Sequence, residues 1–329
     1  MRSGVRVAAI APEGEGLFRL GLADGAAAWA RHVVLATGRD GLGGPRILPG
    51  FDPAWRGALW AHSSDAIGFA ALRGRRVAVV GAGASAFDNA AEALEAGCAA
   101  LTLLVRRPAL PAVNASKALD SRGHAHGWAS LPDAWRWRLM REVERRQTPP
   151  PREAVLRVAR HPNAGLRLGC PVLGVARRGD ALRLETPAGA AAADFVVLGT
   201  GFAQDLGLRP ELAAVAPEIR LWRDAHAPPP GEEDPALGAS PYLDEAFAFT
   251  PRRPGRAPHL ARLHAFNHAA TRSLGKLSGD VPAISAGAGR LARGICARLL
   301  AADVEAHWRR LRDFGTPELL GDEWGDAGG

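Results

Sequence analysis

The residues of this chain best suited to chemistry form one short turn, Gly81-Ala82-Gly83-Ala84-Ser85-Ala86. A strand-like run, residues 75–80, precedes the turn, and a run rich in Ala and Glu, residues 87–96, follows it. In this G-x-G-x-x-A pattern the first glycine permits a tight turn, the second lets the backbone approach a diphosphate, and the small third residue lets helix and strand pack closely. N–H groups at the helix start favour negative charge, and Ser85 adds a hydroxyl donor. The pattern predicts a dinucleotide-binding turn, with a plain tight turn in a structural βαβ unit as the alternative.

The charge at the end of the next strand indicates which dinucleotide binds. Residues 101–105 have the composition of that strand, and Arg106 and Arg107 follow it directly. A site for NADH carries Asp or Glu here, which accepts a hydrogen bond from the ribose 2′-hydroxyl. An acid would repel a 2′-phosphate, whereas a guanidinium group binds it through paired hydrogen bonds. The position favours NADPH, with two solvated arginines in an Arg-rich chain as the alternative.

The elements expected around the turn are typical of an α/β fold with a parallel sheet. A strand, the glycine turn, a helix and a second strand make a βαβ unit. Two further apolar runs, residues 33–36 and 194–198, end at Thr37-Gly38 and at Gly199-Thr200-Gly201, and we expect the first to be a strand buried on both faces. We also expect strands at residues 5–10, 17–22, 26–30, 166–168, 171–176 and 181–185, helices within 115–160 and 284–312, and an irregular, mostly surface segment at 222–262.

Composition and charge exclude several classes of protein. Hydrophobic residues make up 47% and charged residues 23% of the 329 residues, which is typical of a globular chain. The net charge of +7 comes from arginines spread along the chain without an aromatic-basic recognition motif, so we expect an anionic cofactor and no nucleic acid. The sequence has no apolar run of about 18 residues and no signal-peptide core, so we expect a cytoplasmic protein without membrane contact.

The cysteines and histidines give no metal or dithiol pattern. Cys98, Cys170 and Cys296 lie far apart and form no C-x-x-C pair, which argues against a zinc ribbon or a dithiol redox site. Their odd number fits a reducing cytoplasm. His264 and His268 are four residues apart, which is the spacing of metal ligands on a helix. Because no third ligand accompanies them, we predict no metal site and expect both on a surface helix.

Three further patches have the form of known sequence elements. Residues 33–38 are similar to a strand and loop at which an FAD domain passes into an NADPH domain. Residues 55–65, which contain His62 and Ser63, resemble an aromatic-x-Gly…His-(Ser/Thr) signature, and residues 194–202 resemble an Asp-x-x-x-Leu-Ala-Thr-Gly-Tyr element. Together these patches make the chain resemble the flavin-dependent NADPH monooxygenases, the group that contains flavin-containing, Baeyer–Villiger and N-hydroxylating enzymes.

The resemblance implies an α/β fold in which a Rossmann-like NADP-binding domain is inserted into an N-terminally incomplete FAD/NAD(P)-binding domain of three-layer ββα character. The implied domains are residues 1–70 and 194–329 for the FAD-type domain and residues 71–193 for the NADP-binding domain. Asp280, in a C-terminal Gly-Asp element, would lie near the ribityl chain of the flavin, with a helix N-cap as its alternative. For His62 the alternative is a satisfied loop histidine. The cofactor-binding residues that the resemblance adds to the turn are Thr37, Gly38, His62, Ser63, Thr200, Gly201 and Asp280.

The reaction that the resemblance implies begins with hydride transfer from NADPH to FAD, after which the reduced flavin reacts with O₂ to oxygenate a substrate that the sequence does not identify. Because the flavin carries this chemistry, we name no catalytic residue. The lack of a cysteine pair argues against a flavoprotein disulfide reductase.

The family begins with its own G-x-G-x-x-G turn for the FAD diphosphate, and nothing rich in glycine between a strand and a helix precedes residue 33. We expect a misassigned start codon, a natural truncation or a degenerate flavin site. The prediction is therefore an NADPH- and FAD-dependent oxidoreductase of the monooxygenase type. Its alternative is a truncated, non-catalytic NADP-binding module.

Overall fold

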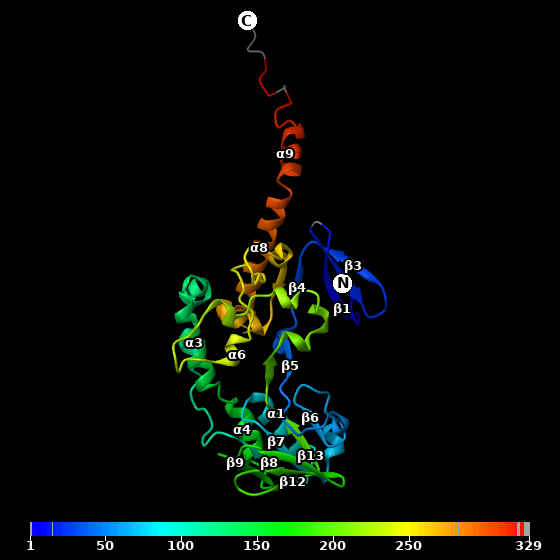
Figure 1. Cartoon of the computed structure of the whole chain (residues 1–329), viewed down its shortest axis with the longest axis vertical. Coiled ribbons are helices and arrows are strands. Elements are labelled where there is room, and N and C mark those ends of the chain that lie inside the picture. The colour runs from blue at the N-terminus through cyan, green and yellow to red at the C-terminus, as the bar shows by residue number, and fades with distance from the viewer. Residues whose placement is uncertain (1, 15, 280, 282, 321–322, 326–329) are drawn as a thin grey trace.

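The computed structural model describes residues 2–14, 16–279, 281, 283–320 and 323–325, and these residues form two lobes (Figure 1). The nucleotide lobe is built around a parallel sheet from the central part of the chain. The meander lobe combines segments from the beginning and the end of the chain. A ribbon of two antiparallel strands, β5 (Gly43–Pro45) and β14 (Phe202–Gln204), connects the lobes.

The nucleotide lobe contains five parallel strands in the order β6-β13-β7-β8-β9. They are β6 (Trp60–His62), β7 (Arg76–Val80), β8 (Ala100–Leu104), β9 (Ala164–Arg167) and β13 (Phe195–Leu198). The helices α1 (Ala84–Glu95) and α4 (Arg152–Ala159) cover one face, and the antiparallel strands β10 (Gly174–Arg178), β11 (Ala181–Glu185) and β12 (Ala191–Ala193) cover the other. This sheet with its crossover helix confirms the predicted α/β fold class.

Both faces of the central strand β7 are buried, which explains its unbroken apolar sequence. Val77 and Val79 belong to the core on the side of α1, whereas Ala78 and Val80 belong to the core on the side of β11. This division follows from the alternation of side chains along a strand.

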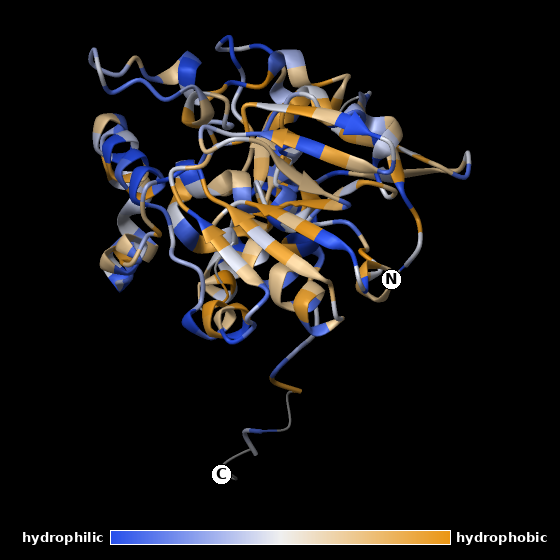
Figure 2. Ribbon diagram, turned by 90° about the horizontal axis from the view of Figure 1, so that it is seen from below, coloured by the Kyte–Doolittle hydropathy of each residue, from blue (hydrophilic) through white to orange (hydrophobic). Residues whose placement is uncertain are grey.

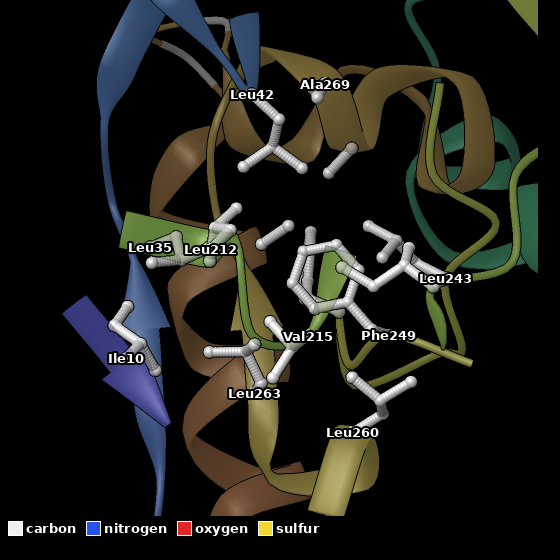
Figure 3. Packing of buried hydrophobic residues seen from close by; sticks show 14 of the residues in the cluster. Ile10, Leu35, Leu42, Leu212, Val215, Leu243, Phe249, Leu260, Leu263 and Ala269 are labelled. Atoms are coloured by element: carbon white, nitrogen blue, oxygen red, sulfur yellow. The ribbon is translucent and has the colours of Figure 1, made fainter. Parts of the chain in front are cut away.

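The meander lobe begins with three antiparallel strands, β1 (Val7–Glu13), β2 (Leu17–Leu22) and β3 (Ala27–Ala30). The next strand, β4 (Val33–Leu35), pairs in parallel with β15 (Leu263–Ala265) from the far end of the chain. The core of the meander lobe therefore contains residues from distant segments of the chain, among them Leu35, Val215 and Phe249 (Figure 3). The helices α8 (Ile284–Ala302) and α9 (Val304–Asp313) follow, which confirms the helical C-terminal part.

A helical insert lies between β8 and α4 in sequence but packs on the meander lobe. It contains α2 (Arg122–Gly127) and α3 (Asp133–Arg146), and it contacts α5 (Trp222–Ala225), α6 (Pro235–Gly238) and α7 (Thr271–Leu274). At its centre the guanidinium of Arg136 is buried, donates to the Ser273 carbonyl over 3.1 Å and lies over the Trp222 ring at 5.0 Å. The insert thereby forms a second connection between the lobes, beside the β5–β14 ribbon.

One sequence prediction about burial is wrong, and a second holds for most of its segment. The run 33–36 is not buried on both faces, because β4 pairs with β15 on one side and Val34 remains 38% exposed. The segment 222–262 is irregular and most of its residues are exposed or half-buried, as expected, but one part of it is buried. Its residues 240–249 include Leu243, Phe247 and Phe249 in the core of the meander lobe, because irregular backbone there bonds with β15 and α7.

The distribution of polarity agrees with the two cores. Figure 2 shows hydrophobic residues concentrated on the strands in the middle of the molecule and hydrophilic residues more frequent on the outer helices and loops. No helix in the described ranges has the length and apolar character needed to cross a membrane.

Candidate dinucleotide and flavin site

The turn between β7 and α1 has the backbone that a diphosphate site needs. Gly81 has a φ of 137°, and a Cβ there would stand 2.2 Å from the Gly199 carbonyl oxygen, so only glycine fits. Gly83 is the N-cap of α1, has no side-chain cap, and offers open space where a Cβ would be. Ala82 is half-buried, and Ala84 and Ser85 are exposed in the first turn. The start of α1 therefore presents its backbone N–H groups to solvent, which suits an anion.

The third position of the motif packs against a strand far away in sequence. Ala86 is fully buried, and a Cβ on Gly199 would stand 2.7 Å from its Cβ. Gly199 follows β13, which lies beside β7 in the sheet. Sequence reasoning missed Gly199 as a site residue, although its place directly after a buried strand was a usable signal. Gly81, Ala86 and Gly199 thus hold the turn in shape together.

The two arginines after β8 have different surroundings. β7 and β8 are parallel neighbours, and the Gly81 N–H donates to the Leu104 carbonyl over 3.1 Å, so the residues after β8 lie beside the turn. Arg106 is exposed there. Arg107 is half-buried and donates through Nη2 to the Arg145 carbonyl, 3.0 Å away at the end of α3. Arg106 is therefore available to a ligand, whereas Arg107 also attaches the helical insert.

His62 is buried behind the site. Its Nδ1 accepts from the Ser64 backbone N–H at 3.2 Å, so its Nε2 carries the hydrogen and donates to the Gly201 carbonyl at 3.0 Å. Burial lowers the pKa of His62, which favours this neutral form. Both ring nitrogens are thus satisfied, and the geometry gives His62 a positioning role. Ser63 continues the pairing of β6 with β13, since its N–H donates to the Leu198 carbonyl over 3.0 Å.

The two strand ends that resemble each other in sequence lie at the two ends of the ribbon. Gly201 and Gly38 both have positive φ, 75° and 68°, and open space at the Cβ position. The Thr200 hydroxyl donates to the Arg46 carbonyl, and the Arg46 N–H donates to the Gly201 carbonyl over 2.9 Å. On the side of the meander lobe, the Thr37 hydroxyl donates to the Gly41 carbonyl over 2.6 Å.

Asn267 holds the end of β4, at Leu35 and Thr37, through its side chain. This side chain is fully buried, and its Nδ2 donates to the Leu35 carbonyl over 3.0 Å and to Thr37 Oγ1 over 3.1 Å. Its Oδ1 accepts from the Ala269 N–H over 3.0 Å. Thr37 and Gly38 are thereby brought next to residues 267–279, although the ribbon separates them from Thr200 and Gly201.

A buried hydroxyl that has no partner in the described part of the chain lies next to the turn 268–270, which contacts the turn 38–40. The Thr271 hydroxyl is buried and has no hydrogen-bond partner among the described residues. His268 Nδ1 lies 3.4 Å from Arg39 Nη1, and burial together with Arg39 and Arg272 lowers the pKa of His268 to about 3. A Cβ on Gly279 would stand 3.3 Å from His268 Nδ1. The unpaired Thr271 hydroxyl, the open backbone of Gly38 and the nearby Arg39 guanidinium fit the polar parts of a flavin nucleotide. Asp280 lies outside the described residues.

The expectation of a surface helix for His264 and His268 is wrong. His264 lies on β15 and is fully buried, and His268 lies on a 3₁₀ turn, because a strand ends between them. His264 donates through Nδ1 to the Ala246 carbonyl over 2.8 Å, and its Nε2 lies 3.0 Å from His32 Nδ1. Within the described ranges, no group of three or more His, Cys, Asp or Glu residues is arranged to hold a metal ion.

Comparison with known proteins supplies the relatives of this chain. No family model matches it. The chain is 36% identical over 325 residues to the FAD-dependent urate hydroxylase of Xanthomonas campestris pv. campestris, an alignment that covers 98% of the chain and 68% of that protein.

Solved structures share the fold at lower identity. Reduced ornithine hydroxylase from Pseudomonas aeruginosa is 18% identical, with a TM-score of 0.66 over 90% of this chain and 71% of that one. Ornithine N-hydroxylase from Kutzneria sp. 744, with reduced FAD, NADP⁺ and L-ornithine, is 17% identical, with a TM-score of 0.64 over 89% of this chain and 72% of that one. At these identities the likeness concerns the two-dinucleotide fold.

Proposed function

Because this chain belongs to the flavin-dependent NADPH monooxygenase family that includes the FAD-dependent urate hydroxylase, we propose that it hydroxylates a small molecule with NADPH and FAD. The chain is an NADPH- and FAD-dependent oxidoreductase of the monooxygenase type, and the non-catalytic module is not favoured. The observation that carries the cofactor assignment is the uncapped start of α1 beside the open backbone of Gly83.

For NADPH we assign the diphosphate to the turn and the 2′-phosphate to Arg106. The N–H groups of residues 83–85 point from an exposed helix start, and the helix dipole favours negative charge there. Arg106 lies at the tip of the neighbouring parallel strand and is exposed. A guanidinium fork matches a phosphate dianion better than any neutral side chain does. Ser85 adds a hydroxyl at the same helix start.

For FAD we assign the region along the ribbon, from Gly201 at one end to Gly38 and residues 267–279 at the other. Bound FAD supplies the capacity to accept a hydride from NADPH and to activate O₂. The backbones of Gly38 and Gly201 allow close approach, and the Thr271 hydroxyl is free to donate or accept. Neutral His62 positions this region by holding the Gly201 carbonyl. In the described part of the chain, one dinucleotide turn of the G-x-G-x-x-A type is present, and it is the NADPH turn.

For the substrate we propose urate, the compound in the name of the 36% identical relative. Urate is a planar oxopurine that carries negative charge at neutral pH. Arg39 and the buried Arg272 both act electrostatically on His268, and because Arg272 pairs with Glu144 over 2.9 Å, Arg39 is the cation that supports an anionic ligand in the region assigned to the flavin. This charge supports an anionic substrate.

The test uses the purified full chain supplied with FAD. NADPH oxidation and O₂ consumption are measured with urate and, for comparison, with ornithine or without substrate. Urate-dependent consumption of both, with formation of a hydroxylated product, is the expected result. A chain that takes up flavin and oxidises NADPH but ignores urate would overturn the substrate assignment alone. A colourless chain that binds NADPH and cannot be loaded with FAD would instead favour the non-catalytic module.

A further inference from the structure

The C-terminal helix α9 presents an uncovered apolar face. All ten of its residues are exposed or half-exposed, and Figure 1 shows the helix extending beyond the meander lobe. Val304 is 60% exposed, Trp308 59% and Leu311 68%. Leu300, one turn earlier at the end of α8, is 58% exposed. Large apolar side chains gathered at one exposed place mark an interaction surface.

These side chains share one side of the helix. At 3.6 residues per turn, Val304, Trp308 and Leu311 fall within an arc of about 60°. Hydrogen bonds from Asp303 N–H to the Leu299 carbonyl and from His307 N–H to the Asp303 carbonyl, both 3.0 Å, carry the helical path from α8 into α9. Leu300 therefore extends the same face by one turn. A face of this kind is what a second helix packs against.

The charged residues beside the apolar face favour a second, antiparallel copy of α9 as the partner. Glu305 and Arg312 are seven residues apart, so both lie on the same flank of the helix, and both are exposed. Among the described residues, neither forms an ion pair within the chain. If two copies of α9 pack antiparallel, each Glu305 faces the Arg312 of the other copy. In a parallel arrangement like charges would face each other, which is unfavourable.

We propose that α9 is the interface through which two copies of this chain pair, antiparallel, about a twofold axis next to Trp308. The midpoint between Glu305 and Arg312 lies between residues 308 and 309, which places the two indoles against each other at the centre. A twofold interface uses the same patch on both copies, and this patch is self-complementary in charge and apolar in its middle. The turn that begins α1 lies in the other lobe, at the far end of the molecule (Figure 1). Pairing therefore leaves the turn assigned to NADPH open.

The first experiment measures the molar mass of the full chain by light scattering over a range of concentrations. The expected mass is twice the 34.6 kDa of one chain, falling toward one chain on dilution. Leu311→Glu should give the mass of one chain at all concentrations. Leu173→Glu is the matched control, because Leu173 is also 68% exposed but lies in the nucleotide lobe, and it should remain paired.

The second experiment exchanges the charges. Glu305→Arg and Arg312→Glu should each weaken pairing by roughly tenfold, because each creates two like-charge contacts in the symmetric interface. The double variant should regain the pairing of the original chain. NADPH binding, measured in parallel, should be unchanged in every variant, which separates this proposal from the proposed function. A single-chain mass for the original protein, or a double variant no better than the single ones, would overturn the proposal, as would a monomer that floats with anionic lipid vesicles.

Discussion

Gly199 and Ala86 lie so close together that a methyl group on Gly199 would stand 2.7 Å from the Ala86 Cβ. The first residue follows β13 and the second opens the inward face of α1, so this contact sets the distance between helix and sheet at the dinucleotide turn. Gly81 is held by the same segment, since its own Cβ would stand 2.2 Å from the Gly199 carbonyl oxygen. The shape of the turn thus depends on a strand more than one hundred residues away.

Gly199→Ala should therefore damage both stability and NADPH binding. The added methyl group meets backbone and a buried Cβ, so α1 must move, at a cost of about 1–3 kcal/mol in the free energy of unfolding. Urea unfolding and NADPH titration measure the two effects. Gly127→Ala is the control, because a Cβ there meets nothing within 4 Å and φ is −97°. Equal stability of the two variants would contradict the assigned role of this contact.

Arg136→Met should loosen the helical insert. The buried guanidinium donates to the Ser273 carbonyl and to the Tyr242 hydroxyl, 3.0 Å away, and it pairs with Asp133. Its removal leaves the buried Ser273 carbonyl without this donor and Asp133 without its cation. We expect a loss of roughly 1.5–3 kcal/mol in the free energy of unfolding. Arg138→Met is the control on the same helix, since Arg138 is 47% exposed and its pair with Glu232 at the surface contributes little to stability. A larger loss for Arg138→Met would refute this ranking.

The local parts of the fold could be predicted from the sequence, because their signals lie within one element. The βαβ unit around Gly81 follows from the glycine spacing and the apolar runs on either side. The helices α8 and α9 follow from a long stretch without proline after residue 282. In each case the periodicity of neighbouring residues decides the structure.

The parts that could not be predicted depend on contacts between distant segments. Phe247 and Phe249 are buried by strands and helices from both ends of the chain, so an irregular sequence gave no sign of burial. His264 and His268 have helical spacing, but pairing of residues 263–265 with β4 makes a strand of the first. For the candidate site, the turn was visible in sequence, whereas the constraint from Gly199 arises only when β13 is placed beside β7.

The stacked pair of His32 and His264 predicts sensitivity to acid. Burial, then the charges of His264, Arg298, Arg262 and Arg31, lower the pKa of His32 from 6.5 to about 4, and burial also lowers that of His264. As the pH falls below 6.5, His32 takes up a proton in the unfolded chain, whereas in the folded chain it stays neutral down to about pH 4. The free energy of unfolding should therefore fall between these two values, and this histidine should cause no further loss below them.

Urea unfolding at several pH values measures this loss of stability. His32→Gln should make the dependence on pH shallower, because the amide can still donate to His264 Nε2, 3.0 Å from the present donor, without taking up a proton. An unchanged dependence in this variant would show that other groups cause the acid sensitivity.

Arg106→Ala should reduce the affinity for NADPH far more than the affinity for NADH. A hydrogen bond between charged groups contributes roughly 1.5–3 kcal/mol, so we expect about a tenfold to hundredfold loss for NADPH and little change for NADH. Arg107→Ala is the matched control, because Arg107 donates to the Arg145 carbonyl and its removal should affect both nucleotides alike through the helical insert. Titration of both reduced nucleotides into each variant measures the difference. Equal losses for NADPH and NADH in Arg106→Ala would mean that another residue binds the 2′-phosphate. NADH lacks this phosphate, so a residue that contacts only the phosphate cannot change the affinity for NADH.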